Sequence, residues 1–391
     1  MSERKRIPRL KGNDYSEQAA QQRRSFLEEQ TGTSLTNTRH YSLDPASVEG
    51  NTENFIGVVQ MPLGVAGPYR INGEHAQGDF YIPMATTEGT LIASYSRGMR
   101  LVSESGGCTV TVVGEAMQRA PLFELASARE ARALSQWLEE NFAAIKAEAE
   151  STTRVGTLEN IQSWVIANKL FTRFNYLTGD AAGQNMTGKA THKACQWVLS
   201  NFSGIQNFSL SGGIETDKKH SHMNLLHSRG KKVVAEAVIK KELLQSLMRA
   251  EPERMVRLRQ RTIVGSLLAG SAYNGPHSAN GIAAMFIATG QDEANVVESH
   301  AGIAFMDLTD NGDLYYSVTL PSIICASYGG GTGLATQREC LEMMGCYGEG
   351  KAHKLAEIIA ATVLAGDLSL AAAVVSDEWV SSHDQLGRNR P

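Results

Sequence analysis

The stretch AHKLAEIIAATVLAGDLSLAAAVV, residues 352–375, decides the fold of this chain. Ala, Leu, Ile and Val dominate it over roughly seven helical turns, and charged side chains are few. A helix that is apolar on all sides is buried, whereas a surface helix keeps a polar face. We therefore predict a long helix that packs in a core.

Outward from this helix, the sequence alternates between predicted strands and helices. Asn72-Gly73 predicts a hairpin turn between strands 69–71 and 79–82, and Asn311-Gly312 predicts another between 303–308 and 314–320. Helical spacing predicts further helices at about 14–31, 88–105, 126–149, 184–202, 242–249, 254–273 and 277–289. The last two are apolar and low in charge, so we expect them to be buried. Around a strand predicted at 163–176, a helix–strand–turn–helix block suggests a small α/β insert.

Composition excludes several classes of protein. The chain has 391 residues, which suggests two or three domains, and a net charge of −4, which argues against a nucleic-acid partner. The five cysteines form no CxxC pair, so we predict reduced thiols in a cytoplasmic protein and no zinc site. The charged N-terminus does not resemble a signal peptide, and no uninterrupted apolar run predicts a membrane partner.

Two glycine-rich segments are similar to nucleotide-binding loops, but key positions in each do not match those motifs. The cluster 329–333 does not match GxGxxG, because Leu334 stands where the last glycine belongs. It suits either a tight turn or backbone N–H groups that approach a phosphate or amide. Residues 345–352 nearly spell a P-loop, but Ala352 replaces the Ser or Thr that would hold magnesium. Gly345 is better interpreted as a helix C-cap.

Four short segments carry groups suited to carbonyl chemistry. They offer the Glu88 carboxyl, the Lys218 ammonium, the Asp292 carboxylate and the His383 imidazole. Such groups can polarise a carbonyl, supply a proton and protonate a thiolate leaving group. Each also has a structural alternative: a first-turn helix acid, a solvated loop lysine, a cap and a surface histidine. His220 and His222 lack an apparent third ligand, so we predict no metal site.

Read in order, the motifs resemble one family, the 3-hydroxy-3-methylglutaryl-coenzyme A (HMG-CoA) reductases. The matching segments run from about residue 40 to the C-terminus. They are Glu53-Asn54-Phe55-Ile56-Gly57, Pro62-Leu63-Gly64-Val65-Ala66-Gly67-Pro68, Thr86-Thr87-Glu88-Gly89, Gly179-Asp180-Ala181-Ala182-Gly183-Gln184-Asn185-Met186, Thr216-Asp217-Lys218-Lys219, Arg229-Gly230-Lys231, Val234-Ala235-Glu236-Ala237, Gly290-Gln291-Asp292 and Ser382-His383. The chain is most similar to soluble members of the first class, which use NADPH.

The resemblance implies an α+β fold and a division into domains. A large α/β substrate-binding and catalytic domain, built around a central helix, would comprise 53–120 and 209–375. A small ferredoxin-like NADP-binding domain would be inserted at 121–208. An N-terminal helical region at 1–52 and a mobile C-terminal flap at 376–391 would complete the chain. The resemblance also implies a homodimer, or a higher even oligomer, with active sites shared between subunits.

The same resemblance implies roles for individual residues in reducing a thioester through a hemithioacetal and an aldehyde. Lys218 would stabilise the oxyanion of the substrate, with Asp292 against it. Glu88 would supply a proton to the aldehyde oxygen, and His383 would protonate the departing coenzyme A thiolate. Substrate contacts would be Arg119, Ser211, Lys219, Asn280 and Ser382. NADPH contacts would be Thr153, Arg154 beside the 2′-phosphate, Asp180, Asn185 and Gly330.

Several positions depart from the usual pattern of the family. Ala182 and Gln184 stand where Met is usual, Gly275 where Asn is usual and Arg261 where Lys is usual. The segment His220-Ser221-His222 replaces Pro-Ala-Ala, and Tyr328 replaces a smaller apolar residue. These positions leave two alternatives to an HMG-CoA reductase. One is a paralogue that reduces another acyl-coenzyme A thioester, and the other is a catalytically silent regulatory homologue.

Overall fold

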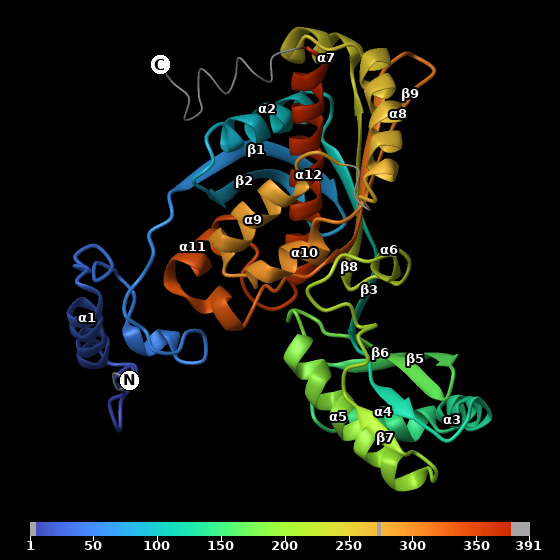
Figure 1. The fold of residues 1–391 in the computed structure, drawn as a ribbon. Helices are drawn as coiled ribbons and strands as arrows, with labels where there is room; N and C mark the ends of the chain where they lie inside the picture. The colour runs from blue at the N-terminus through green and yellow to red at the C-terminus, as the bar shows by residue number, and fades with distance from the viewer. Residues whose placement is uncertain (1–4, 272–274, 377–391) are drawn as a thin grey trace.

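The computed structural model describes residues 5–271 and 275–376, and these form an α+β fold (Figure 1). The strands are β1 (Leu63–Gly73), β2 (Gln77–Ala85), β3 (Cys108–Arg119), β4 (Leu122–Glu124), β5 (Thr157–Ile166), β6 (Lys169–Leu177), β7 (Asn207–Ser209), β8 (Gly230–Ile239), β9 (Ile303–Leu308) and β10 (Leu314–Ile323). The α-helices are α1 (Glu17–Thr31), α2 (Leu91–Glu104), α3 (Ala128–Glu140), α4 (Phe142–Glu150), α5 (Gln184–Asn201), α6 (His222–His227), α7 (Lys241–Met248), α8 (Pro252–Leu268), α9 (Ser278–Thr289), α10 (Val296–Ser299), α11 (Ala335–Met343) and α12 (Ala352–Val375). Short 3₁₀ turns are η1 (Pro45–Val48), η2 (Glu293–Asn295) and η3 (Gly330–Gly333).

Helix α12 confirms the prediction of a buried helix at 352–375 (Figure 1). It packs against α2, α9, β3, β8 and β10 within the larger hydrophobic cluster. Its packing against α2 is close, because a Cβ at Gly98 would lie 1.9 Å from the Ala365 carbonyl oxygen. By length and composition α12 could cross a membrane, but 89% of its most apolar window is buried inside the protein. Its hydropathy is therefore that of a core helix.

The strands form two sheet regions joined through β3. The path of strands runs β7-β4-β6-β3-β8-β10-β9, with β1 on β3, β2 on β1 and β5 on β6. The first part of β3 pairs with β8, and its last residues, Met117 to Arg119, pair with β6. A second hydrophobic cluster, made by β6 with α3, α4 and α5, lies apart from the cluster around α12. Figure 1 shows these elements as a separate layer at the end of β3.

The first hairpin forms, but its turn lies two residues beyond the predicted position. Asn72 and Gly73 belong to β1, and the loop is Glu74-His75, closed by a Gly73 N–H to Ala76 O bond of 2.8 Å. The buried Glu357 carboxylate of α12 explains the shift. It accepts the backbone N–H groups of Glu74, His75 and Ala76 at 3.1, 2.9 and 2.6 Å. A contact over 280 residues therefore outweighs the local turn preference.

Three other predicted elements are wrong in detail. The helix predicted from Glu88 begins at Leu91, because Thr90 adopts a left-handed conformation with φ of 70°. The single helix at 126–149 is two helices, α3 and α4, and the strand at 163–176 is the hairpin β5–β6.

Helix α8 was predicted to be buried, and this is wrong for its second half. Only Pro252, Met255 and Arg259 are buried in this helix. Ile263, Val264, Leu267 and Leu268 are exposed, the last to 85%. The apolar composition of this end is therefore not explained by the core of a single chain.

Candidate active site

The Lys218 ammonium lies at the centre of a polar cluster contributed by three segments. Its Nζ forms an ion pair with Asp292 and donates to Asn295 Oδ1 at 2.6 Å and to Gln184 Oε1 at 3.3 Å. The Lys218 side chain is 33% exposed, so the cluster opens to solvent. A lysine held by a carboxylate and two amide oxygens is a fixed positive charge, suited to stabilising a developing oxyanion.

A buried charge network holds the backbone of Lys218. Lys218 adopts φ of 55°, which is uncommon for a residue with a side chain. Its N–H donates to Glu298 Oε1 at 2.6 Å, and the buried Arg229 reaches the same oxygen at 3.4 Å and Asp217 Oδ1 at 2.8 Å. Burial raises the pKa of Glu298, although the Lys218 N–H and Arg229 oppose the shift. The buried Glu298 carboxylate therefore stabilises the unusual backbone conformation of Lys218.

Asp292 is placed by the end of α9. Gly290 ends the helix at φ of 66°, a conformation that favours glycine, and a Cβ there would lie 2.3 Å from the Gly331 carbonyl oxygen. Asp292 then caps η2 through the Ala294 N–H at 3.2 Å, while its other oxygen faces Lys218. Asp292 therefore both caps η2 and contacts Lys218.

Glu88 does not lie with Lys218 and Asp292 in this chain. It precedes α2, so it is not a first-turn acid, and its Oε2 accepts from Asn280 Nδ2 at 2.7 Å. Asn280 is in the first turn of α9 and Asp292 follows the last turn, so about 14 Å of helix lies between the two pairs. The structure brings Glu88 to Asn280 and Lys218 to Asp292, and it leaves these pairs at opposite ends of α9.

The predicted substrate contacts also lie in different parts of the structure. Arg119 lies near the lysine cluster, because its Nη2 donates to the Gln184 carbonyl at 3.2 Å. The Ser211 hydroxyl donates to the buried Glu215, and the exposed Lys219 donates to the Asp217 carbonyl at 3.0 Å. Ser382 and His383 lie outside the described residues.

Asp180, a predicted NADPH contact, has a second role in the structure. Its carboxylate accepts from the backbone N–H groups of Gly350, Lys351 and Ala352 at 2.7, 3.0 and 3.1 Å, at the start of α12. Partial burial opposes the change, but these bonds and the Ser327 hydroxyl lower the pKa of Asp180. Asp180 therefore caps the core helix.

The other predicted cofactor contacts lie at the start of α5 and at the glycine cluster. Arg154 and Asn185 are exposed. Thr153 Oγ1 lies 3.0 Å from Met186 Sδ, which brings the 153–156 loop against the first turn of α5. Gly330, with φ of 59°, is exposed in η3. An arginine on a loop that contacts the first turn of a helix can help to hold an anionic group.

Gln184, Asn295 and Glu298 are site residues that the sequence did not identify as such. Gln184 was noted only as a departure from the usual Met. Nothing marked Asn295 or Glu298, and their contacts with Lys218 span 77 and 80 residues. The signal that could have found Gln184 is its polarity at a position where the family is apolar.

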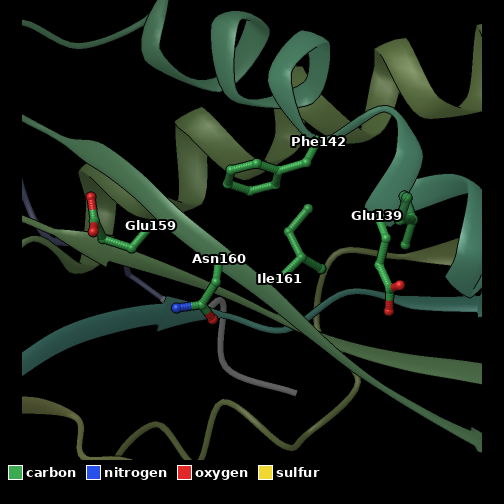
Figure 2. Close-up of a pocket in the computed structure, with 6 residues that line it drawn as sticks. Glu139, Phe142, Glu159, Asn160 and Ile161 are labelled. Atoms are coloured by element: carbon green, nitrogen blue, oxygen red, sulfur yellow. The ribbon is translucent and has the colours of Figure 1, made fainter.

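Two other groups of residues do not belong to this cluster. A pocket of about 290 Å³ lies between the α3–α4 junction and β5, as Figure 2 shows, and is lined by Leu138, Glu139, Phe142, Glu159, Asn160 and Ile161. None of these is a predicted site residue. Over residues 5–271 and 275–376, one group has the spacing of metal ligands: Glu74, His75 and Glu357. Glu357 already accepts three backbone N–H groups there, so its role is to stabilise the β1–β2 hairpin.

The comparisons with known proteins agree with the resemblance. The family model for hydroxymethylglutaryl-coenzyme A reductase matches residues 19–388. A 3-hydroxy-3-methylglutaryl-coenzyme A reductase of Methanothermobacter thermautotrophicus is 44% identical over 95% of this chain and 94% of its own length. That of Strongylocentrotus purpuratus is 43% identical over 86% of this chain and 37% of its own length.

Among solved structures, the chain is similar to a class II reductase of this name from Streptococcus pneumoniae, solved with NADPH in open conformations. The TM-score is 0.70 at 20% identity, with 91% of this chain and 86% of that chain covered, which establishes a shared fold. Because the family model spans nearly the whole chain and the relatives exceed 40% identity, the chain belongs to the hydroxymethylglutaryl-coenzyme A reductase family.

Proposed function

We propose that this protein reduces HMG-CoA to mevalonate and coenzyme A with NADPH, by two hydride transfers through mevaldehyde. The observation that carries the proposal is the Lys218 ammonium, fixed by Asp292 and two amide oxygens in a family of reductases. Bound NADPH would supply the hydride in each step. The thioester carbonyl becomes an oxyanion as hydride adds, and Lys218 is the donor placed to stabilise it.

The remaining steps are proton transfers by this chain's own residues. Glu88 gives a proton to the aldehyde oxygen during the second reduction, and Asn280 orients its carboxyl group. His383 protonates the coenzyme A thiolate as it leaves. Arg119 and Ser211, with Lys219, Asn280 and Ser382, contact the substrate.

The residues around the start of α5 fit NADPH. The exposed Arg154 presents a planar fork for the 2′-phosphate, and the loop that carries it contacts α5 through Thr153 and Met186. Asn185 and Gly330 are exposed and contact the cofactor in this proposal. Asp180 contacts it from its position beside the start of α12.

The domain division that fits this function is the one predicted from the resemblance. Residues 121–208 form the inserted NADP-binding domain, which the separate hydrophobic cluster supports. Residues 53–120 and 209–375 form the catalytic domain, with a helical region at 1–52 and a flap at 376–391. The protein belongs to the class I-like, cytoplasmic members. The segment Ser151-Thr152-Thr153-Arg154, which resembles that of the first class, supports this class.

A homodimer, or a higher even oligomer, shares the active sites. Two observations support it. The exposed apolar end of α8 is continuous with the edge strand β9, where Ile303 and Phe305 are half exposed, and such surfaces mark protein contacts. Glu88 and Lys218 also lie at opposite ends of α9, so a second subunit can bring the missing partner to each pair.

The proposal is tested by following NADPH oxidation by the purified protein with HMG-CoA and with other acyl-coenzyme A esters. We expect turnover with HMG-CoA, and NADPH used in preference to NADH. Arg154→Ala should raise KM for NADPH much more than KM for NADH, because the guanidinium pairs with the 2′-phosphate. Turnover with another ester alone identifies a paralogue of different specificity, and no turnover with any ester identifies a silent homologue.

A further inference from the structure

All three hydrogens of the Lys218 ammonium are used within the protein. A lysine ammonium has three donors and no acceptor. Here one faces Asp292, one faces Asn295 Oδ1 at 2.6 Å and one faces Gln184 Oε1 at 3.3 Å. The proposed reaction requires that one of these hydrogens pass to the substrate carbonyl. One of the three acceptors must therefore leave.

Gln184 is the acceptor that can leave at least cost. Its bond to Nζ is the longest of the three and lacks the charge of Asp292. Asn295 is buried, whereas Gln184 is partly exposed at the first position of α5. The Gln184 side chain keeps a second bond, from its Nε2 to Asn295 Oδ1 at 2.8 Å. The amide can therefore turn its oxygen away from the lysine while its Nε2 keeps the side chain near Asn295.

Gln184 also links the lysine to two other parts of the site. Its carbonyl accepts from Arg119, the predicted substrate contact, and its helix begins beside the Thr153 loop. A methionine at this position would offer only a weak acceptor. The third acceptor of the lysine therefore depends on the residue at position 184.

We propose that Gln184 is a positioning residue whose amide oxygen holds the third ammonium hydrogen of Lys218 until the substrate carbonyl displaces it. The inference rests on the proposed reductase function. Gln184 keeps the ammonium directed at the reacting carbonyl, and it competes with that carbonyl for one hydrogen bond. Its side chain therefore sets the apparent affinity for the thioester.

Two substitutions at this position change the competition in opposite directions. Gln184→Met keeps the length of the side chain and removes the strong acceptor. A hydrogen bond to a charged group is worth about a factor of ten or more, but this one is long at 3.3 Å, so KM for the thioester should fall about threefold to tenfold. Gln184→Glu places a charged acceptor against the ammonium, so KM should rise by at least as much. Gln196→Met is the matched control, an exposed glutamine of the same helix that faces His192.

The kinetic test measures KM and kcat for HMG-CoA in the wild type and these three variants. We expect KM to increase in the order Met, Gln, Glu at position 184, with kcat changed less than KM and the control unchanged. An inverted order, or a fall in kcat with KM unchanged in both variants, overturns the proposal, because Gln184 would then only support the local structure.

A second readout does not depend on the reductase function. Limiting acetic anhydride acetylates lysines, and peptide mass spectrometry gives the ratio of acetylation at Lys218 to that at Lys219. The Lys218 nitrogen must leave its hydrogen bonds to react. The ratio should therefore rise at least about twofold in Gln184→Met and fall in Gln184→Glu. An unchanged ratio in both variants overturns the inference. If the wild type reduces no acyl-coenzyme A ester while the ratios change as expected, the proposed function fails and the contact stands.

Discussion

At the scale of single residues, the site is built on a lysine with an unusual backbone. A left-handed conformation at a residue with a side chain costs of order 1 kcal/mol or more, and it persists only where the surroundings enforce it. Here the Glu298 carboxylate accepts the Lys218 N–H, and Arg229 ties Glu298 to Asp217. In this conformation the Lys218 Nζ contacts Asp292, whereas the Lys219 Nζ donates to the Asp217 carbonyl.

Lys218→Ala should therefore abolish reduction, and Lys219→Ala should be much milder. An oxyanion donor is worth about 10²–10³ in rate, whereas Lys219 is exposed and donates to the Asp217 carbonyl. The measurement is NADPH oxidation with HMG-CoA, with circular dichroism to check that both variants fold. A Lys218→Ala protein with more than a tenth of wild-type turnover would contradict the role of this lysine, and the reverse ranking would identify Lys219 instead.

His383 should be separable from the other groups by the choice of substrate. In the proposed function its proton goes to the coenzyme A thiolate, and free mevaldehyde has no thiolate. His383→Gln should cripple reduction of the thioester and largely spare reduction of mevaldehyde, whereas Glu88→Gln should impair the aldehyde step. Both rates are measured as NADPH oxidation. Equal damage to both reactions by His383→Gln would indicate a structural role for the histidine.

Which site residues could be predicted from the sequence depended on how local their signals are. Lys218 and Asp292 lie in short motifs that resemble those of the family, and the structure joins them in an ion pair. Asn295 and Gln184 were missed because their bond joins residues 111 apart, which no local pattern encodes. Glu88 was identified as a candidate, but the prediction that it lies in the first turn of a helix was wrong. Thr90 is left-handed, so the helix begins only at Leu91.

At the scale of elements, the composition of residues 352–375 was enough to predict α12, but not how its ends are held. Ala and Leu favour a helix, and the absence of a polar face requires burial. The cap comes from Asp180, about 170 residues earlier, and Glu357 of the helix itself holds the β1–β2 loop. The same kind of distant contact explains why the Asn72-Gly73 turn was misplaced.

Asp180→Asn should destabilise the protein by about 1–2 kcal/mol at neutral pH, because it weakens the cap of the core helix. The folded pKa of Asp180 is lowered. Its stabilisation is therefore fully present above the unfolded value, near 4, and is lost as the pH falls through the folded value. Urea unfolding of wild type and variant at several pH values measures this, with the exposed Asp310→Asn as control. A difference that persists unchanged below about pH 4 would contradict a charged cap.

At the scale of the whole molecule, the arrangement of the two pairs along α9 was not predictable from the sequence. The order of the motifs implied one site, yet Asn280 and Asp292 are separated by the length of the helix. The exposed apolar end of α8 was predicted to be buried for a related reason. A sequence records that a surface is apolar, and it does not record whether the same chain or another copy covers it.

Mixing two inactive variants tests whether a second subunit completes the site. Lys218→Ala and Glu88→Ala should each be inactive alone. If one site uses Lys218 of one subunit and Glu88 of the other, a hybrid dimer contains one site with neither substitution and one with both. One of the two sites in each hybrid dimer is then intact, so the purified hybrid should show about half of wild-type activity.

The two variants are co-expressed, each with a different affinity tag, and the hybrid dimer is purified through both tags. NADPH oxidation is then measured on this hybrid. Each variant paired with itself is the control. If Lys218 and Glu88 of the same subunit formed a site, every site in the hybrid would carry one substitution, and no activity would return. Recovery therefore distinguishes a shared site from one in which a rearrangement within a single chain closes the distance along α9.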